Sequence, residues 1–128
     1  MTGYLLDTHV IIWLATNAPM SDKANSLVDS GAPLYFSVAS LWEMTIKKST
    51  GRADFTVDIP AFRSDAIAAG YLELNIETGH AVAVGSLAAI HRDPFDRMLI
   101  AQATVEGMRL LTVDSEIIKY GDPVIDIR

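Results

Sequence analysis

The same local pattern occurs twice in the chain, as YLLDTH at residues 4–9 and as LLTVDS at residues 110–115. Each stretch is a short apolar run, typical of a buried β-strand, and each ends in an aspartate, Asp7 or Asp114. In an open α/β sheet the carboxyl ends of parallel strands share one edge, and ligands bind in the crevice outside it. We therefore expect the two carboxylates to face a common crevice, although each could serve only as a helix N-cap.

Strand-like and helix-like patterns alternate along the rest of the chain. Apolar or alternating runs predict strands at residues 4–6, 34–38, 71–74, 110–113 and 124–127. Helical periodicity in the longer gaps predicts helices at residues 10–15, 21–29, 39–49, 61–69, 78–89 and 94–106. This order is typical of an α/β fold in which helices cover both faces of a mostly parallel central sheet.

Composition limits the class of protein. The chain has 128 residues, half of them hydrophobic, which is enough for one core, and we expect a single domain over residues 1–128. It contains no cysteine, which excludes disulfides and thiolate metal sites and fits a reducing compartment. The first 14 residues do not resemble a signal peptide, and no uncharged apolar run reaches the roughly 18 residues that a membrane span needs. We expect a soluble, cytoplasmic protein.

The net charge of the chain is −6, which argues against binding nucleic acid through a broad basic surface. A nucleic-acid substrate would therefore need a local source of positive charge. The dense basic run of Lys47, Lys48 and Arg52 either contacts such a substrate or simply favours the C-terminal end of a helix.

Glu43 lies early in a predicted helix, in the segment SVASLWEMTIKKS. Its spacing from Ser40 matches a capping box, in which the carboxylate would only accept a bond from a backbone N–H. Apolar neighbours, including Trp42 and Ile46, instead indicate a partly enclosed helix start, where an unpaired carboxylate is unfavourable. A bound cation would relieve that cost, so Glu43 is a candidate metal ligand.

A dense group of charges stands at the start of HRDPFDRMLIAQA, residues 91–103, before an almost wholly apolar helix. A helix that is apolar on all sides is a buried one. Asp93 suits the N-cap, and Asp96 lies in the first turn, where the helix dipole and free N–H groups stabilise a carboxylate. Because Arg92 and Arg97 flank the same spot, the segment is either the lining of a pocket or a plain ion-pair cluster.

Four candidate acids thus come from four separate elements, Asp7, Glu43, Asp96 and Asp114. If they meet at one edge of the sheet, a hard divalent cation would relieve their mutual repulsion, and Mg²⁺ and Mn²⁺ prefer oxygen ligands. Such an ion can activate water and neutralise charge on a phosphodiester. Even an acidic chain could therefore hydrolyse nucleic acid.

Four blocks of the sequence together resemble PIN-domain proteins of the VapC toxin type. They are LLDTHVIIWL (5–14), SVASLWEMTIKKSTGR (37–52), HRDPFDRMLIAQA (91–103) and LLTVDSEIIKYGDPVI (110–125). The resemblance implies a three-layer α/β/α sandwich and a metal-dependent endoribonuclease, the toxin component of a type II toxin–antitoxin pair. It also implies an RNA substrate, a cognate antitoxin whose C-terminal segment covers the site, and a homodimer.

The resemblance also assigns residues. Asp7, Glu43, Asp96 and Asp114 match the family's acids, which would hold one or two Mg²⁺ or Mn²⁺ ions. Thr8 matches a small hydroxyl residue beside the first acid, where it would bond a ligand water or steady Asp7.

Two neighbours of Asp96 receive supporting roles. Asp93 is expected to be a cap or to support the ligands. For Arg97 we add a hypothesis: its guanidinium holds the scissile phosphate or pairs with Asp93.

None of the three histidines has metal-ligand spacing with another, so none is expected to be a ligand. His9 follows Asp7 closely and could support it. His80 is expected to be a hydrogen-bonded core residue, and His91 to lie in a loop.

Other classes of protein fit less well. A phosphorelay receiver needs a phosphate-accepting aspartate after the third strand, where Asn75 stands, and a haloacid-type phosphatase needs an aspartate where His9 stands. A non-catalytic binding module stays open, with the acids as caps and ion pairs. Surplus apolar residues, including 10–14, Met20 and Met44, would then form a partner surface.

Overall fold

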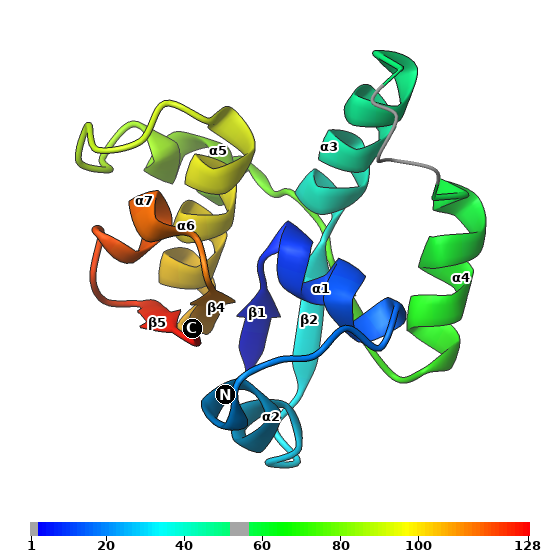
Figure 1. The fold of residues 1–128 in the computed structure, drawn as a ribbon. Helices are drawn as coiled ribbons and strands as arrows, with labels where there is room; N and C mark the ends of the chain where they lie inside the picture. Colours follow the sequence, from blue (N-terminus) through cyan, green and yellow to red (C-terminus); the bar gives the residue numbers. More distant parts are fainter. Residues whose placement is uncertain (1–2, 52–56) are drawn as a thin grey trace.

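The computed structural model describes residues 3–51 and 57–128 (Figure 1). Within these ranges the elements follow in this order: β1 (Tyr4–Leu6), α1 (Thr8–Ala15), α2 (Asp22–Val28), β2 (Leu34–Ser37), α3 (Val38–Ser49), α4 (Ile59–Ala68), β3 (Leu72–Leu74), α5 (Thr78–Val84), α6 (Pro94–Glu106), β4 (Arg109–Thr112), α7 (Ser115–Ile118) and β5 (Val124–Asp126). No helix in the described residues is both long and apolar enough to cross a lipid bilayer.

The five strands form one sheet in the order β3-β2-β1-β4-β5, and every neighbouring pair is parallel. The prediction of an α/β fold with a mostly parallel central sheet is confirmed. The chain leaves β1 towards β2 and β3 on one side, whereas β4 and β5 lie on the other. The strand order therefore reverses between β1 and β4, and ligands bind outside the carboxyl edge at such a reversal.

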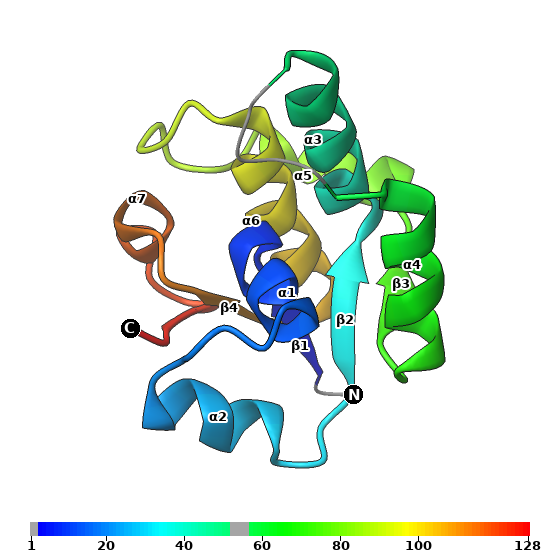
Figure 2. The same cartoon turned by 45° about the vertical axis from the view of Figure 1, so that its right-hand side comes forward.

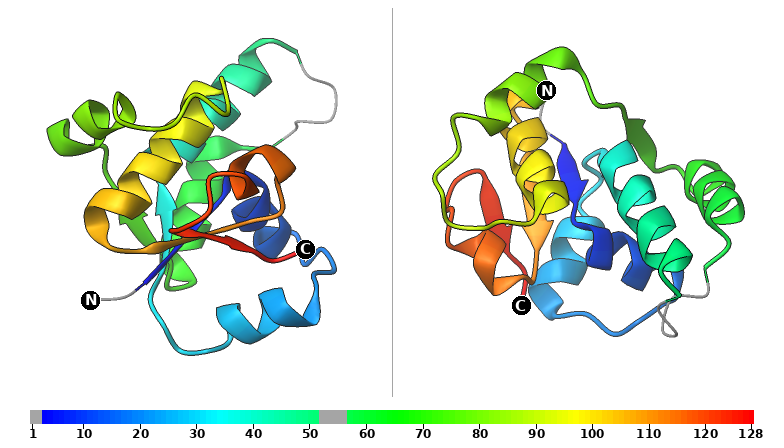
Figure 3. Two further views of the ribbon diagram at one scale, coloured as in Figure 1. Left: turned by 90° about the vertical axis from the view of Figure 1, so that its left-hand side faces the viewer. Right: turned by 90° about the horizontal axis from the view of Figure 1, so that it is seen from above.

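Alternate residues of the central strands pack into two separate hydrophobic cores, one on each face of the sheet. Leu6 and Leu111 point into a core with α1, α2 and α4, whereas Leu5 and Leu110 point into a second core with α6 and α7. This separation follows from the two-residue period of a strand, which sends successive side chains to opposite faces. The further views place α1 and α6 on opposite sides of the sheet, as a three-layer sandwich requires (Figures 2 and 3).

Helices α7, α5 and α3 are among the elements that differ from the sequence-based prediction. The short helix α7 was not predicted, because four residues are too few to display a helical period. Helix α5 ends at Val84, before the expected residue 89, and the carbonyls of Val84 and Ala88 accept hydrogen bonds from Arg97 instead. Helix α3 begins at Val38, so its start lies inside the segment predicted as a strand.

Two glycines give a matched test of backbone strain. Gly107 follows the last residue of α6 with a φ of 68°, and it has open space where the Cβ of an alanine would lie. Alanine there would cause no clash, so its cost is the strain of a left-handed backbone conformation. We expect Gly107→Ala to lower the free energy of unfolding by about 1–2 kcal/mol. Gly79 lies in α5 without a positive φ and is equally open, so Gly79→Ala should be neutral or stabilise by about 0.5 kcal/mol. Urea unfolding of both variants measures the difference, and equal stabilities would contradict the argument.

Candidate metal centre

Asp7 lies at the carboxyl end of β1 and is only 2% exposed. Its Oδ1 accepts a hydrogen bond from the Thr8 N–H (2.7 Å), and its Oδ2 accepts one from the Thr112 hydroxyl (2.7 Å). Burial raises the pKa of Asp7, and the nearby charge of Glu43 adds to that effect, although the two hydrogen bonds oppose it. Asp7 is thus both the N-cap of α1 and a buried acid at the edge of the sheet.

Asp114 lies across the strand-order reversal from Asp7. Its Oδ1 caps α7 by accepting hydrogen bonds from the N–H groups of Glu116 (2.8 Å) and Ile117 (3.2 Å). Its own N–H donates to the Thr112 hydroxyl (3.0 Å), which also binds Asp7. Thr112 therefore connects the two acids, a role that sequence reasoning missed; the only signal is its place two residues before Asp114.

Asp96 lies in the first turn of α6 and is 8% exposed. Its pKa is raised to about 7, chiefly by burial and then by the charges of Asp7, Asp93 and Glu43. A hydrogen bond with His91, in which the ring Nε2 is 2.7 Å from Asp96 Oδ2, acts in the opposite direction. The ionised form of Asp96 is therefore less favourable in the protein alone than in water.

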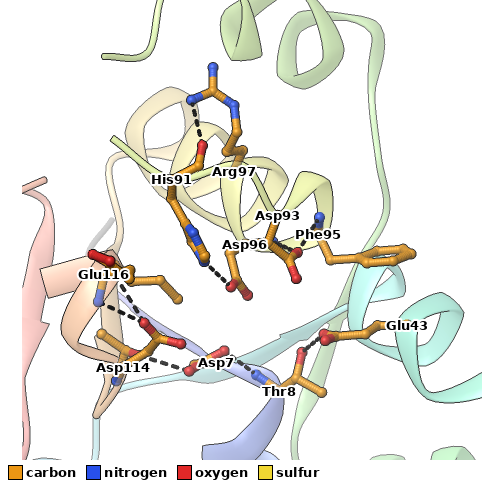
Figure 4. Close-up of polar contacts among 12 residues, drawn as sticks. Asp7, Thr8, Glu43, His91, Asp93, Phe95, Asp96, Arg97, Asp114 and Glu116 are labelled. Atoms are coloured by element: carbon orange, nitrogen blue, oxygen red, sulfur yellow. Dashed lines mark hydrogen bonds and ion pairs between the residues drawn. The ribbon is translucent and has the colours of Figure 1, made fainter. Parts of the chain in front are cut away.

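The ligand-type atoms of His91, Asp96 and Asp114 all lie within 4.8 Å of one another (Figure 4). This spacing is close enough for one metal ion. The prediction that His91 lies in a loop is confirmed, and its closeness to Asp96 and Asp114 makes it a candidate ligand that the spacing argument did not consider. That argument compared histidines only with one another, whereas His91 meets carboxylates.

Glu43 is buried beside Asp7 and Asp96 but makes its own contacts. Its Oε1 accepts a hydrogen bond from the Thr8 hydroxyl (2.8 Å), and its Oε2 pairs with Lys47 Nζ (2.8 Å). The capping-box alternative is wrong, because Ser37 is the N-cap of α3 and the Ser40 hydroxyl instead contacts that of Thr8.

The surroundings of Glu43 also differ from expectation. Trp42 is 57% exposed, so the helix start is enclosed on one side only. The Thr8 hydroxyl contacts Glu43 and Ser40, whereas Thr8 reaches Asp7 through its backbone N–H.

Asp93 and Arg97 have separate roles. Asp93 is the N-cap of α6, and its Oδ1 accepts hydrogen bonds from the N–H groups of Phe95 (2.9 Å) and Asp96 (3.0 Å). Arg97 donates to three backbone carbonyls and to the Tyr120 hydroxyl, and its guanidinium points away from the carboxylates (Figure 4). The hypothesis that Arg97 pairs with Asp93 is therefore wrong, and a phosphate contact would require the guanidinium to leave these partners.

Two other histidines lie outside the cluster. His80 is fully buried, accepts a hydrogen bond from the Glu77 N–H and contacts Glu106, which confirms it as a hydrogen-bonded core residue. His9 is exposed and lies near Trp13, with 6.5 Å between ring centroids.

The predicted basic run makes contacts within the chain. Lys47 pairs with Glu43, and the Lys48 ammonium donates to the Val57 carbonyl. Arg52 lies outside the described residues.

The apolar surface differs from the expected one. Met44 and the start of the 10–14 run are buried in the core, and Met20 is half-buried. Large exposed apolar side chains are instead Trp42, Ile46, Ile67, Leu72, Val82, Ile90 and Val105.

The donors fit a divalent cation. Burial raises the pKa values of Asp7 and Asp96, so their charged forms lack full compensation from the protein. Within residues 3–51 and 57–128, only Lys47 among the lysines and arginines forms an ion pair with one of the four acids, Glu43. Carboxylate oxygens and an imidazole nitrogen are common ligands of divalent metals.

The raised pKa of Asp96 predicts how stability depends on pH without metal. The folded protein holds the proton up to about pH 7, whereas an unfolded aspartate loses it near pH 3.9. The folded state thus binds more protons in this window, and its stability should fall as pH rises from about 4 to 7. In EDTA we expect the Tm difference between pH 5 and pH 8 to shrink in Asp96→Asn. If Asp96→Asn had the same dependence of Tm on pH as the wild type, the raised pKa of Asp96 would be contradicted.

Comparison with known proteins identifies the family. A model of the PIN domain matches residues 4–123. The DNA-bound VapBC structure from Salmonella typhimurium matches with a TM-score of 0.70, at 17% identity, over 100% of both chains. VapBC-1 from nontypeable Haemophilus influenzae matches with a TM-score of 0.69, at 18% identity, over 98% of both chains. A toxin–antitoxin complex from Klebsiella pneumoniae matches with a TM-score of 0.66, at 17% identity, over 98% of both chains.

A comparison with curated protein sequences finds no significant match. The structural likenesses, all at low identity, establish the fold. The family rests on the sequence match, which extends from β1 to the residue before β5 and includes the segments that carry Asp7, Glu43, Asp96 and Asp114. The chain therefore belongs to the PIN domain family.

Proposed function

We propose that this PIN domain is a metal-dependent endoribonuclease and the toxin component of a type II toxin–antitoxin pair. PIN domains are generally nucleases. The observation that carries the proposal is the meeting of buried and half-buried acids at the carboxyl edge of the sheet. Asp7 and Asp114 flank the strand-order reversal, and Asp96 joins them from the start of α6 with a pKa raised to about 7.

The chain's residues would divide the work of such a site. Asp7, Asp96 and Asp114, with Glu43 beside them, would hold one or two Mg²⁺ or Mn²⁺ ions. When bound, a divalent ion supplies an activated water and neutralises charge on the phosphodiester. Thr112 and the N–H groups at the start of α7 orient the carboxylates, and no protein nucleophile is needed. The ion also provides the local positive charge that a chain of net charge −6 otherwise lacks for RNA.

Protein partners are part of the same proposal. The solved structures that share this fold include toxin–antitoxin complexes. We propose a cognate antitoxin and a second copy of the chain as partners. An apolar cavity of about 490 Å³ between α1 and α4, and exposed side chains such as Trp42 and Val82, support the presence of protein contacts.

The test is cleavage of RNA by the purified, antitoxin-free chain. Structured and unstructured RNAs are incubated with Mg²⁺, with Mn²⁺ and with EDTA, and we expect metal-dependent cleavage in single-stranded or loop regions. If no condition gives cleavage, a metal titration separates two explanations. Metal binding then indicates a very selective nuclease, whereas its absence favours a non-catalytic binding module.

A further inference from the structure

His91 lies in the loop before α6, with its ring directed into the acidic cluster (Figure 4). Its Nε2 is 2.7 Å from Asp96 Oδ2, and Asp114 offers a third ligand-type atom within 4.8 Å of both. The side chain is 20% exposed, so an ion from solvent can reach the ring. The ring nitrogen and two carboxylates therefore lie close enough together to bind one ion.

The backbone of His91 is fixed on both sides. Its N–H donates to the Tyr120 hydroxyl (2.8 Å), and its carbonyl accepts from Arg97 Nη1 (3.4 Å). Arg97 also donates to the Tyr120 hydroxyl (3.2 Å) and to the carbonyls of Val84 and Ala88. These contacts hold the loop in place through α6 and the turn after α7. Outer contacts of this kind commonly orient metal ligands.

We infer that His91 is a nitrogen ligand of the metal centre, together with Asp96 and Asp114, and that this mixed donor set favours Mn²⁺ over Mg²⁺. Mg²⁺ binds oxygen ligands in a strict octahedral shell and retains several waters. Divalent first-row transition metals accept imidazole nitrogen as well as carboxylate oxygen. The inference deepens the proposed function and depends on it for the presence of an ion. It also gives Arg97 and Tyr120 a positioning role.

The test measures Mn²⁺ bound to the full chain by pulsed electron paramagnetic resonance, which detects a coordinated nitrogen through its nuclear spin. We expect a nitrogen signal in the wild type that changes frequency when histidine is labelled with ¹⁵N. The signal should disappear in His91→Gln, which keeps a hydrogen-bonding side chain without an imidazole. The exposed His9, near Asp7, gives the matched control His9→Gln, in which the signal should persist.

Calorimetry provides the second readout. His91→Gln should weaken Mn²⁺ binding by about 10-fold to 100-fold and change Mg²⁺ binding by less than about twofold. Mn²⁺ binding without a nitrogen signal, or a signal that survives in His91→Gln, would overturn the ligand role and leave the proposed function intact. A wild type that binds Mg²⁺ but no Mn²⁺ would overturn the inference alone, and one that binds neither ion would overturn both. If His91→Gln fails to fold, an isotope shift that persists in His9→Gln still assigns the nitrogen to His91, because the remaining histidine, His80, is fully buried and bonded to Glu106.

Discussion

Asp7→Asn should reduce metal-dependent RNA cleavage by about 100-fold or more while leaving the fold intact. Asp7 is the buried acid at the end of the central strand β1, and its charge reaches both Glu43 and Asp96. Asparagine has nearly the same shape but carries no charge, so it removes electrostatic attraction for a cation without opening a cavity. Initial rates with saturating Mn²⁺, together with circular dichroism, measure the two effects.

The same variant should be at least as stable as the wild type in EDTA. Burial raises the pKa of Asp7, so the folded protein gains when the charge is removed. Asparagine keeps a carbonyl oxygen for the Thr8 N–H, and its amide can donate to the Thr112 hydroxyl. The control Asp29→Asn makes the same change at an exposed acid at the end of α2 and should leave activity unchanged. A lower Tm for metal-free Asp7→Asn would contradict the argument that the buried charge of Asp7 destabilises the folded protein.

Much of the fold could be predicted because its causes are local. The apolar runs ending at Asp7 and Asp114 have the period and length of buried strands, and parallel strands share one carboxyl edge whatever lies between them in sequence. Asp93 and Pro94 similarly mark the start of α6, because a cap and a first-turn proline act on neighbouring backbone groups.

Two of the errors involve contacts between segments far apart in the sequence. Helix α5 ends earlier than predicted, and Arg97, from the later helix α6, donates hydrogen bonds to the carbonyls of Val84 and Ala88. Glu43 does not form the expected capping box, because Ser37 rather than Ser40 is the N-cap of α3. Its carboxylate instead accepts a hydrogen bond from Thr8, which belongs to another helix. Such choices depend on tertiary contacts between segments that the sequence does not display side by side.

The candidate site shows the same division. The carboxylates at strand ends could be placed from the sheet alone, since the topology determines which edge they occupy. The ring of His91 is brought to Asp96 and Asp114 by a loop whose path is held by Tyr120 and Arg97. No periodic pattern describes such a loop, so the histidine was expected only to lie in it.

Thr112→Val should lower metal affinity and RNA cleavage by about 10-fold to 100-fold, although Thr112 is not a candidate ligand. Its hydroxyl is fully buried, donates to Asp7 Oδ2 and accepts from the Asp114 N–H. Valine fills the same space but does neither, so both acids lose a fixed orientation. Because the Thr112 bond lowers the pKa of Asp7, its loss should also make the charged form of Asp7 less favourable.

Valine at position 112 should also cost about 1–3 kcal/mol of unfolding free energy, because it leaves buried polar groups without a partner. The control Thr45→Val removes an exposed hydroxyl that donates to the Leu41 carbonyl within α3, and it should change stability by less than about 0.5 kcal/mol. Thr112→Ser keeps the hydroxyl and should restore most metal affinity. If Thr112→Val lost stability but kept its Mn²⁺ affinity, the Thr112 hydroxyl would support only the fold. The orientation of Asp7 and Asp114 would then have to come from the backbone N–H groups at the starts of α1 and α7 that donate to them.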